Sequence, residues 1–510
     1  MLSTTLCYGL SGIDGIQITV EVNVSNGLPV FEIVGLPDAA VRESRERIRA
    51  AVKNCGFPFP DDRITVNLAP ADIKKEGPAF DLPIAVAILA CEKRVNPTSI
   101  SGRAILGELA LDGSVRPVRG VLPMAISAHD HGITDMILPK DNAKEVMCVS
   151  GVNFYPVETL TDVVKLLSGE KPIAPVETVE FSNLIQKREH AFDFRFVKGQ
   201  RSAKRALEIA AAGGHNVLMV GPPGSGKTLM ARCVPSILPD MSFEEALVAT
   251  RIHSVAGSMP ETGLLTERPF RSPHHTASHV SLVGGGIHAT PGEISKAHHG
   301  VLFLDELPEY RRDVLEALRQ PMEDGFVTIT RVSAQSTYPS EFMLICSMNP
   351  CPCGHYGSKT HECRCTPNDI RKYLSRISGP LLDRIDMHIE VESIPAERLS
   401  DEAESESSMD IHARVEAARA VQRKRYQAVP SLNCNARLSA QTLQRFCPMD
   451  KEAREMLNLA TQSMGLSNRA YTRVIKVART IADLAGESKI TAAHVAEALQ
   501  YRAIDDKYWH

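Results

Sequence analysis

The stretch NVLMVGPPGSGKTLM, residues 216–230, runs from an apolar segment through a glycine-rich loop into a segment that begins at Lys227. The apolar segment is typical of a buried strand, and the residues after the loop are typical of a helix. The loop GPPGSGKT fits the pattern G-x-x-x-x-G-K-[ST] at every position, and a strand before it and a helix after it are the context that this pattern requires. The stretch therefore predicts a phosphate-binding loop in an α/β domain.

The residue types of this loop suit the binding of ATP. Glycines let the backbone turn its N–H groups toward phosphate, where side chains would block the approach. Lys227 can reach the β- and γ-phosphates, the hydroxyl of Thr228 can ligate Mg²⁺, and the helix adds its positive dipole end. A chance glycine turn is the alternative, and the apolar strand before the loop argues against it. The predicted ATP-binding residues are Gly221, Pro222, Pro223, Gly224, Ser225, Gly226, Lys227 and Thr228.

A second apolar strand ends in two carboxylates. The segment VLFLDE, residues 301–306, would present Asp305 to Mg²⁺ and Glu306 to the attacking water. A solvated strand end is the alternative for such a pair, but its distance downstream of the loop favours the catalytic role. A further apolar strand at Phe342–Ser347, with helical segments between the strands, predicts a parallel sheet covered on both faces.

Bulk properties narrow the class of protein. The net charge of −4 gives no general attraction to nucleic acid, so any contact with DNA must come from a local patch. The N-terminus lacks the features of a secretory signal, and the longest apolar run, Pro83–Cys91, is too short to cross a membrane. Twelve cysteines without an export signal argue against a disulfide framework and predict a reducing, cytoplasmic location with no membrane partner.

At 510 residues the chain is expected to form about three domains. The first is predicted to be α/β, because Ile16–Val24 alternates like a strand, Leu82–Cys91 resembles an apolar helix and Asp112-Gly113 marks a hairpin turn. The C-terminal part has helical spacing, as in Ala470–Ala485. The predicted parts are an N-terminal domain (1–170), a linker (171–190), the ATP-binding core (191–395), an acidic connector (396–410) and a helical lid (411–510).

Four cysteines form two close pairs around a polar loop that follows the strand at 342–347. Because thiolates in two such pairs suit tetrahedral Zn²⁺, we predict a structural zinc site. The Cys-x-Cys spacing is less common than Cys-x-x-Cys, and His355 or His361 could replace one ligand. Four reduced structural cysteines are the alternative, although so polar a loop gives them no core to fill. The predicted ligands are Cys351, Cys353, Cys363 and Cys365.

Longer stretches carry a family resemblance. SPHHTAS (272–278), GEISKAHHGVLFLDEL (292–307), MNPCPCG (348–354) and SGPLLDRID (378–386) resemble the magnesium-chelatase branch of AAA+ ATPases. With the ending SNRAYTRVIKVARTIADL (467–484) and the additional N-terminal domain, the whole chain resembles the bacterial ComM/YifB family. The resemblance implies a homo-oligomeric ring of six subunits that hydrolyses ATP to act as a helicase on DNA, driving branch migration during natural transformation.

The resemblance also adds three catalytic groups. Asn349 matches the sensor 1 residue that helps orient the attacking water, Arg384 matches the arginine finger supplied by a neighbouring subunit, and Arg469 matches sensor 2 on the lid. Arg376 is a weaker candidate for the finger. From the residues alone, Arg384 would be assigned to a surface salt bridge. An arginine that acts between subunits would tie activity to assembly.

Two segments are candidates for contacting DNA in the pore of such a ring. Gly325–Ser347 is predicted as a β-hairpin whose strands are FVTITRV and FMLICS, and Phe270–His299 is an insertion rich in Gly, His and Ser. Solvated arginines near a turn are the alternative to phosphate contacts. With no carboxylate or cysteine at ligand spacing, a loop or subunit-interface role is favoured for His274, His275 and His279. The predicted DNA-contacting residues are Arg271, Lys296 and Arg331.

The N-terminal domain resembles the proteolytic domain of Lon, which has an S5-like fold. The stretch KEGPA, Lys75–Ala79, matches the one that holds Lon's catalytic serine, but Ala79 occupies that position and Met124 falls where the partner lysine is expected. Without a nucleophile and its base the domain cannot cleave peptides by that mechanism. We therefore expect a scaffold or a DNA-handling collar.

Three functions are consistent with these sequence features. A DNA motor follows from the family resemblance. A chelatase-type motor that remodels a protein partner is the alternative enzyme, and a nucleotide-dependent assembly scaffold is the alternative with little turnover. The predicted base Glu306 argues against the scaffold, which has no need of a positioned base.

Overall fold

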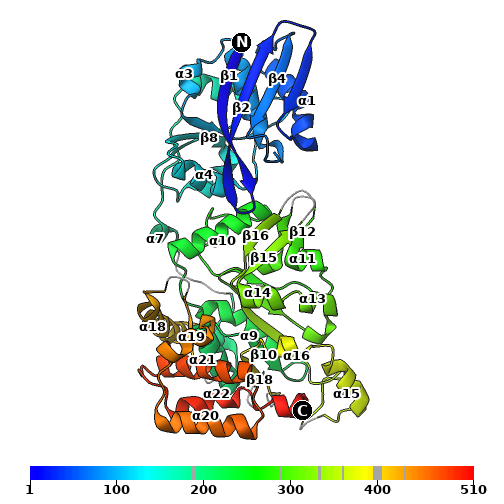
Figure 1. Ribbon diagram of the computed structural model, residues 1–510, viewed down its shortest axis with the longest axis vertical. Coiled ribbons are helices and arrows are strands. Elements are labelled where there is room, and N and C mark those ends of the chain that lie inside the picture. The colour runs from blue at the N-terminus through cyan, green and yellow to red at the C-terminus, as the bar shows by residue number, and fades with distance from the viewer. Residues whose placement is uncertain are drawn as a thin grey trace.

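The computed structural model describes residues 1–185, 191–286, 289–330, 335–358, 361–393, 405–429 and 432–509. The chain is arranged along one long axis, with its N-terminal residues at one end, a parallel sheet in the middle and its C-terminal helices at the other end (Figure 1). Two predicted features lie outside the described residues. They are Arg331 and most of the acidic connector, residues 396–404.

The N-terminal part contains a seven-stranded mixed sheet in which β1 and β2 form a long antiparallel pair. Helices α2 and α4 pack against this pair, and every residue of α2 is buried, as expected for its apolar sequence. The strand order is β3 (Val30–Val34), β4 (Arg63–Ala69), β2 (Asp14–Ser25), β1 (Leu2–Ser11), β5 (Arg103–Ile105), β8 (Asp135–Pro139) and β9 (Asn153–Val157), with the small hairpin of β6 (Glu108–Leu109) and β7 (Val115–Arg116) beside it. The helices are α1 (Ala39–Asn54), α2 (Asp81–Cys91), α3 (Pro97–Ile100), α4 (Val121–Asp130), α5 (Ala143–Val146) and α6 (Leu160–Ser168).

The central part contains a five-stranded sheet in which every pair of neighbouring strands is parallel. Its strands lie in the order β11 (Phe270–Arg271), β14 (Val301–Leu304), β17 (Met343–Met348), β10 (Val217–Val220) and β18 (Met387–Glu390). Along β10, Val217 and Met219 belong to one apolar cluster, whereas Leu218 and Val220 belong to another. The sheet is therefore covered on both faces, and the predicted α/β core with a parallel sheet is confirmed.

The helices of this central part connect and cover the strands. Helix α8 leads into β10, α9 follows the glycine-rich loop, and α10 lies at the end nearest the N-terminal part (Figure 1). The helices are α8 (Arg201–Gly213), α9 (Lys227–Cys233), α10 (Phe243–Ala256), α11 (His279–Val283), α12 (Glu293–Lys296), α13 (Arg312–Glu316), α14 (Arg319–Asp324), α15 (Pro367–Leu374) and α16 (Gly379–Leu382).

The predicted hairpin at 325–347 is correct in its first strand and wrong in its second. β15 (Phe326–Thr330) pairs with β16 (Gln335–Pro339), with Val327 opposite Tyr338. The segment FMLICS instead lies at the start of β17, in the core sheet between β14 and β10. The apolar sequence of β17 suits burial on both faces, whereas the polar sequence QSTYP suits an outlying hairpin.

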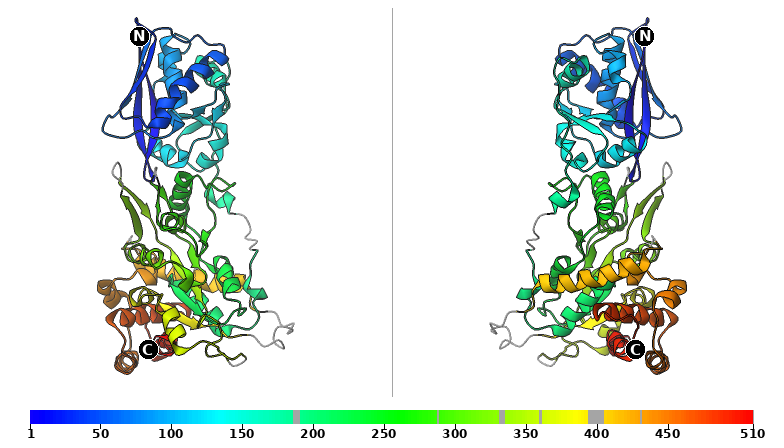
Figure 2. Two further views of the ribbon diagram at one scale, coloured as in Figure 1. Left: turned by 90° about the vertical axis from the view of Figure 1, so that its right-hand side faces the viewer. Right: turned by 90° about the vertical axis from the view of Figure 1, so that its left-hand side faces the viewer.

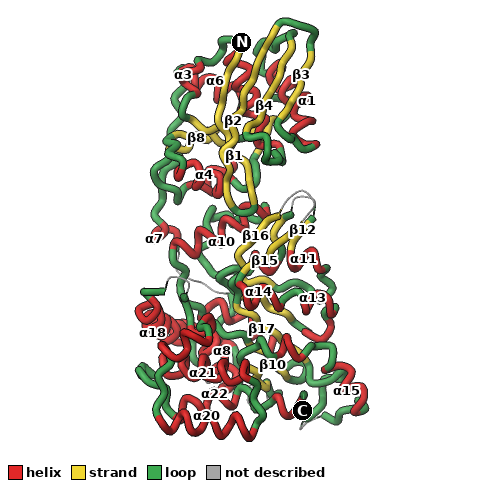
Figure 3. Tube along the Cα trace, in the orientation of Figure 1, coloured by secondary structure: helices red, strands yellow, loops and turns green. Residues whose placement is uncertain are grey.

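The C-terminal part is helical, as predicted, and appears in red in the secondary-structure view (Figure 3). Its predicted helical segment Ala470–Ala485 lies mainly in α21. The helices are α18 (Ser408–Tyr426), α19 (Ala440–Phe446), α20 (Lys451–Ser463), α21 (Asn468–Leu484), α22 (Ala492–Gln500) and α23 (Asp505–Tyr508). No helix in the described ranges is both long enough and apolar enough to span a membrane.

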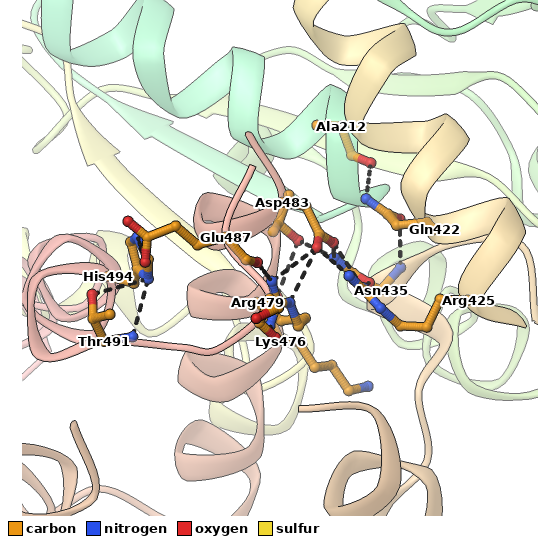
Figure 4. A network of polar contacts seen from close by, with 12 residues as sticks. Ala212, Gln422, Arg425, Asn435, Lys476, Arg479, Asp483, Glu487, Thr491 and His494 are labelled. Carbon is orange, nitrogen blue, oxygen red and sulfur yellow. Dashed lines mark hydrogen bonds and ion pairs between the residues drawn. The ribbon is translucent and has the colours of Figure 1, made fainter. Parts of the chain in front are cut away.

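A buried polar network joins these helices to one another and to the core (Figure 4). Asp483 accepts hydrogen bonds from Arg479 Nε at 3.1 Å and from Arg425 Nη1 at 2.9 Å. Asn435 donates a further one to the Asp483 carboxylate at 2.8 Å. Gln422 extends the network to α8, because its amide donates to Ala212 O at 3.0 Å. Buried charges need this degree of pairing, so the network fixes the lid helices to the ATP-binding core.

The N-terminal part sits directly on one end of the core, as both side views show (Figure 2). The turn between β1 and β2 reaches the core, where Arg251 Nη2 donates to Ile13 O at 3.1 Å. Ser254 on α10 donates to the buried carboxylate of Glu145 at 2.8 Å. The predicted linker also contacts the N-terminal part, since Val176 N donates to Phe154 O at 2.8 Å. These contacts fasten the two parts together.

Candidate nucleotide-binding site

The glycine-rich loop follows β10 and leads into α9, at the carboxyl edge of the parallel sheet. A side chain on Gly221 would meet Val391 O at 2.2 Å, so only glycine fits beside that backbone. Gly224 and Gly226 have φ values of +75° and +88°, and a Cβ on either would point into open space. The loop therefore has the left-handed turns and the open side that a phosphate chain requires.

Lys227 lies inside the loop with its side chain almost fully buried. Its ammonium donates to Gly221 O at 2.7 Å, to Pro222 O at 2.8 Å and to Asn349 Oδ1 at 3.3 Å. Burial lowers the pKa of Lys227 from 10.5 to about 8, although the charges of Asp305 and Glu306 act in the opposite direction. The amine is thus brought together with the predicted sensor Asn349, and near neutral pH it is mostly charged.

The lowered pKa of Lys227 predicts that ATP affinity depends on pH. Bound phosphate favours the charged amine, so the pKa is higher in the complex than in the free protein, where it is about 8. Affinity should be full below that pKa and should fall by up to about tenfold per pH unit above it. Titration of a non-hydrolysable ATP analogue across this range would measure the fall. For Lys227→Arg, the affinity for the ATP analogue should vary less with pH, because arginine stays charged over this range. An equally flat dependence of the wild-type affinity on pH would contradict the prediction.

Oxygen atoms suited to Mg²⁺ lie beside this amine. Thr228 Oγ1 donates to Asp305 Oδ2 at 2.8 Å, and Ser347 Oγ donates to the other carboxylate oxygen. A hydroxyl and a carboxylate are hard ligands of the kind that Mg²⁺ takes in phosphate sites. Together with the open side of the loop, these donors fit Mg²⁺ and ATP. When bound, the ion would offset the negative charge of the phosphates.

Glu306 lies at the mouth of the site and has an unusual backbone. Its φ of +54° is in the left-handed region, which is uncommon for a residue with a side chain. The Glu306 N–H donates to Asp305 Oδ1 at 3.1 Å. Its side chain is 56% exposed and lies 3.7 Å from His275 Nδ1. The carboxylate is therefore accessible to water, as a general base must be.

The two predicted arginines come together elsewhere, at Glu323 of α14. Arg384 is only 5% exposed, and its Nη2 lies 2.5 Å from Glu323 Oε1. Arg469 on α21 lies 3.8 Å from the same oxygen. Arg376 is half exposed and pairs instead with Glu309 at 3.0 Å. The six predicted catalytic residues thus form two groups, one around the phosphate loop and one around Glu323.

The four predicted zinc ligands form one cluster. All four Sγ atoms lie within 4.8 Å of one another, and Cys351 Sγ is 3.4 Å from Cys353 Sγ and 3.7 Å from Cys363 Sγ. These separations approach the edge of about 3.8 Å expected for a tetrahedron with Zn–S bonds of about 2.3 Å. All twelve cysteines of the chain lie in described residues as free thiols. The cluster therefore fits a closed metal site.

The cysteine loop also packs against the phosphate loop. A Cβ on Gly354, which has a φ of +82°, would meet Pro223 Cδ at 2.5 Å. On its other side, Tyr356 packs edge-on against Tyr508 of α23, with ring centroids 6.3 Å apart. The cluster thus lies between the ATP-binding loop and the C-terminal helix.

Sequence reasoning missed several residues of this site. Gln200 Nε2 donates to Ser225 O at 3.3 Å and to Glu392 O at 2.6 Å, which ties the phosphate loop to the end of β18. Ser347 holds Asp305, and His275 faces Glu306. His275 stands in the stretch SPHHTAS, which resembles the family, but the roles of Gln200 and His275 depend on contacts between segments far apart in the chain.

Two of the predicted DNA-contacting residues are engaged by a carboxylate. Arg271 Nε lies 2.6 Å and Lys296 Nζ 3.3 Å from the carboxylate of Glu293. Burial works to raise the pKa of Glu293, but the hydrogen bond and charge of Arg271, together with Lys296, lower it. The ionised carboxylate therefore holds both cations, and either would have to leave it to reach DNA.

The N-terminal part lacks the serine–lysine pair of Lon at the two matching positions, residues 79 and 124. Ala79 and Met124 are both buried in its apolar core. The Cys7 thiol lies 3.9 Å from Ala79 O, but burial raises its pKa far above the usual value, so it stays protonated. A protonated thiol is a poor nucleophile and does not replace the missing serine.

The fold and the site define an ATPase of the AAA+ class. The magnesium chelatase subunit ChlI family matches residues 193–399, the family described as subunit ChlI of Mg-chelatase matches residues 20–142, and the ChlI C-terminal family matches residues 405–502. The chain is 44% identical to competence protein ComM of Haemophilus influenzae, over 97% of this chain and 96% of that protein. It is also 44% identical to YifB of Escherichia coli, over the same shares. The chain belongs to the ComM/YifB family.

The N-terminal part has a separate relationship. Lon protease of Brevibacillus choshinensis is 27% identical over 31% of this chain and 22% of that protein. Lon protease 1 of Bacillus subtilis is 28% identical over 33% of this chain. The predicted Lon-like N-terminal domain, AAA+ core and helical C-terminus are thus confirmed. Membership of this family implies ATPase activity with ATP and Mg²⁺, and supports an ATP-driven motor.

Proposed function

We propose that this protein is a ring-shaped, ATP-driven DNA motor with helicase and branch-migration activity in natural transformation and homologous recombination. The ring is proposed to be a homo-hexamer that works in the cytoplasm. The observation that carries the proposal is that both candidate pore segments form one unit at one end of the ATPase core.

Specific contacts join these two segments. Tyr338 on β16 donates to Ala289 O of the insertion at 2.9 Å. The backbone of Gly284 in the insertion lies so close to Ile329 on β15 that a Cβ would meet its Cδ1 at 2.8 Å. The turn between β1 and β2 also approaches this unit, next to Thr337. DNA held by the hairpin would therefore pass along the N-terminal domain. This path is consistent with the expected role of that domain as a DNA-handling collar.

The hydrolysis site supplies the force in this proposal. Lys227 and the loop N–H groups bind the phosphates, Asp305 and Thr228 hold Mg²⁺, and Glu306 takes the proton of the attacking water. Asn349 orients that water from the end of β17. Positioning and charge compensation are sufficient for phosphoryl transfer, which needs no covalent intermediate on the protein.

Arg384 is proposed to act as an arginine finger at the site of a neighbouring subunit, and Arg469 is proposed to act as sensor 2 on the lid. Arg384 and Arg469 share Glu323 rather than pairing with residues of their own phosphate loop. A ring would bring Arg384 to the ATP of the next subunit, where positive charge stabilises the transition state. Activity would then require assembly.

DNA is proposed to bind by its phosphates at the insertion and the hairpin. Arg271, Lys296 and Arg331 are the proposed contacts, of which Arg331 lies outside the described residues. Glu293 would release the first two when DNA arrives, because phosphates offer them a competing anion.

The cysteine cluster is proposed to hold structural zinc that braces the phosphate loop through Gly354. We expect wild-type protein to contain about one zinc per chain and Cys353→Ser to contain nearly none, because a closed site needs all four ligands. ATP should bind more weakly to the variant, since Gly354 packs on Pro223. Metal analysis and ATP titration measure both effects. Cys55→Ser, a partly exposed cysteine of the N-terminal part, is the control. Metal-free wild-type protein with normal ATP binding would contradict the proposal.

The decisive experiment is ATP turnover by the purified protein with and without forked or four-way DNA. Strong stimulation together with strand exchange supports the DNA motor. Turnover that is indifferent to DNA would exclude it and favour a chelatase-type motor acting on a protein partner. Turnover near zero under every condition would leave an assembly scaffold.

A further inference from the structure

We propose that a cleft at the amino edge of the core sheet binds a phosphate group through Arg419 and Arg437. The cleft lies where the lid segment 432–437 meets the ends of the two segments proposed to contact DNA. It is lined by Gly214, Arg268, His299, Glu341, Arg419 and Arg437, among others. The site stands without the proposed function, and only DNA as a source of the phosphate rests on that function.

The cleft is separate from the ATP site. Gly214 precedes β10, Gly300 precedes β14 and Phe342 precedes β17, so the cleft adjoins the amino ends of these strands. The phosphate loop follows the other end of β10, whose four residues span about 13 Å. The cleft has a volume of about 60 Å³, far below the roughly 300 Å³ at which pockets for drug-sized ligands begin. It is too small for a nucleotide and suits a group the size of phosphate.

Two arginines of the cleft keep donors that an anion can use. Arg419 Nη1 donates to Asn433 O at 2.8 Å, but its Nε is buried without a hydrogen-bond partner. Within the described part of the chain, the Arg437 side chain has neither a hydrogen bond nor an ion pair. Arg268, by contrast, is neutralised by Glu245 at 2.8 Å. Because a guanidinium matches the oxygens of phosphate, the two remaining arginines suit that ligand.

Positive charge is in excess around the cleft. Burial lowers the pKa of His298 well below its usual value, and neighbouring positive charges, among them Arg437 and Arg268, lower it further. The carboxylate of Glu341 accepts a long hydrogen bond from Asn433 Nδ2 at 3.4 Å. The two guanidinium groups that lack an ion pair thus share the cleft with this one carboxylate. A bound anion would offset the excess charge.

The segments on both sides of the cleft are held in place. Asn435, two residues before Arg437, donates to the Asp483 carboxylate at 2.8 Å in the buried network of the lid (Figure 4). On the other side, His299 N donates to Glu341 O at 2.6 Å, which joins the end of the insertion to the end of the hairpin. The phosphate therefore meets a preformed site beside both candidate DNA segments. Its source is either the backbone of DNA along those segments or the free phosphate that ATP hydrolysis releases.

Phosphate titration tests the site in the full-length protein. The phosphate loop is first filled with Mg²⁺ and a non-hydrolysable ATP analogue, and inorganic phosphate is then titrated at constant ionic strength in a calorimeter. The wild type should bind phosphate under these conditions. Arg419→Gln and Arg437→Gln should each weaken binding about tenfold or more, because each loses a charge-assisted hydrogen bond. Arg445→Gln, an exposed arginine over the Phe446 ring, is the matched control and should leave binding unchanged.

Glu341→Gln separates the loss of a ligand contact from misfolding. This variant should bind phosphate about three- to tenfold more tightly than the wild type, because a competing negative charge leaves the cleft. Misfolding would not produce such a gain. Equal phosphate binding by the wild type and both arginine variants overturns the site, as does a wild type that binds no phosphate once its phosphate loop is filled.

DNA binding distinguishes the two sources of phosphate. If the ligand is the DNA backbone, Arg437→Gln should weaken DNA binding and lower its dependence on salt by about one phosphate contact. An unchanged salt dependence, together with weakened phosphate binding, supports a site for free phosphate. If the wild type does not bind DNA, the proposed function fails, while the phosphate titration still decides whether the site exists.

Discussion

Arg384→Ala should lower kcat for ATP by about 10³–10⁵-fold while ATP binding stays near the wild-type level, as for arginines that act between subunits in related chemistry. In its proposed role the guanidinium stabilises charge that develops only in the transition state. The residues proposed to bind ATP lie at the phosphate loop, where Lys227 contacts Gly221 and Thr228 contacts Asp305. Arg384 is not part of these contacts and pairs with Glu323 instead. Steady-state kinetics and ATP titration separate the two effects.

Arg376→Ala is the matched control for this variant. Arg376 is half exposed and pairs with Glu309, and it lies eight residues before Arg384 in the sequence. We expect its loss to lower kcat far less than the loss of Arg384. If Arg376→Ala caused the larger fall, the finger would have to be reassigned to it.

Mixing two inactive variants tests whether Arg384 acts between subunits. Arg384→Ala lacks the finger but keeps its phosphate loop, and Lys227→Ala has the opposite defect. Mixed rings would contain interfaces with both intact groups, so turnover should reappear on mixing. No recovery, in rings shown to exchange subunits, would contradict a role in the neighbouring site.

The contacts of Arg384 within its own subunit add a condition to this prediction. Arg384 is almost fully buried, its Nη1 donates to Pro380 O at 2.6 Å, and Glu323 holds its Nη2. The arginine can reach another subunit only if assembly opens the pair with Glu323. Glu323→Gln should therefore alter the coupling between ring assembly and turnover while leaving the phosphate loop intact.

The sequence predicted the features that depend on short stretches of chain. Short runs of consecutive residues are enough to identify the phosphate loop, the carboxylates after β14 and the helix α21, because strand, loop and helix patterns are local. The parallel arrangement of these strands in one sheet covered on both faces also followed from the alternation of apolar strands and helices.

Features that depend on distant partners were not predictable in this way. The second strand of the hairpin was misassigned to FMLICS, whereas the prediction that the same segment is a strand of the parallel sheet was correct. Nothing in the sequence signals that Arg271 pairs with Glu293, or that Gly354 packs on Pro223. Such contacts join segments that no local pattern relates.

Glu306→Gln should lower kcat by about 10²–10⁴-fold, the usual contribution of a general base, and should trap rings with ATP bound. Glutamine has the same shape but cannot accept the proton of the attacking water. ATP affinity should be retained, because the residues proposed to position the phosphates and Mg²⁺ are Lys227, Thr228 and Asp305, whose contacts the substitution leaves in place. Single-turnover hydrolysis and the retention of labelled ATP on the assembled protein measure these effects.

Two controls distinguish the loss of a base from a general loss of charge. Glu309→Gln changes a carboxylate only three residues away, which pairs with Arg376, and should leave turnover within a fewfold of the wild type. Asp305→Asn should instead weaken Mg²⁺-dependent ATP binding, because its carboxylate accepts the Thr228 hydroxyl at the ion's expected position. Since the left-handed backbone at Glu306 persists in Glu306→Gln, a fall in kcat there reports the carboxylate itself. Normal turnover by Glu306→Gln would move the role of base to another residue.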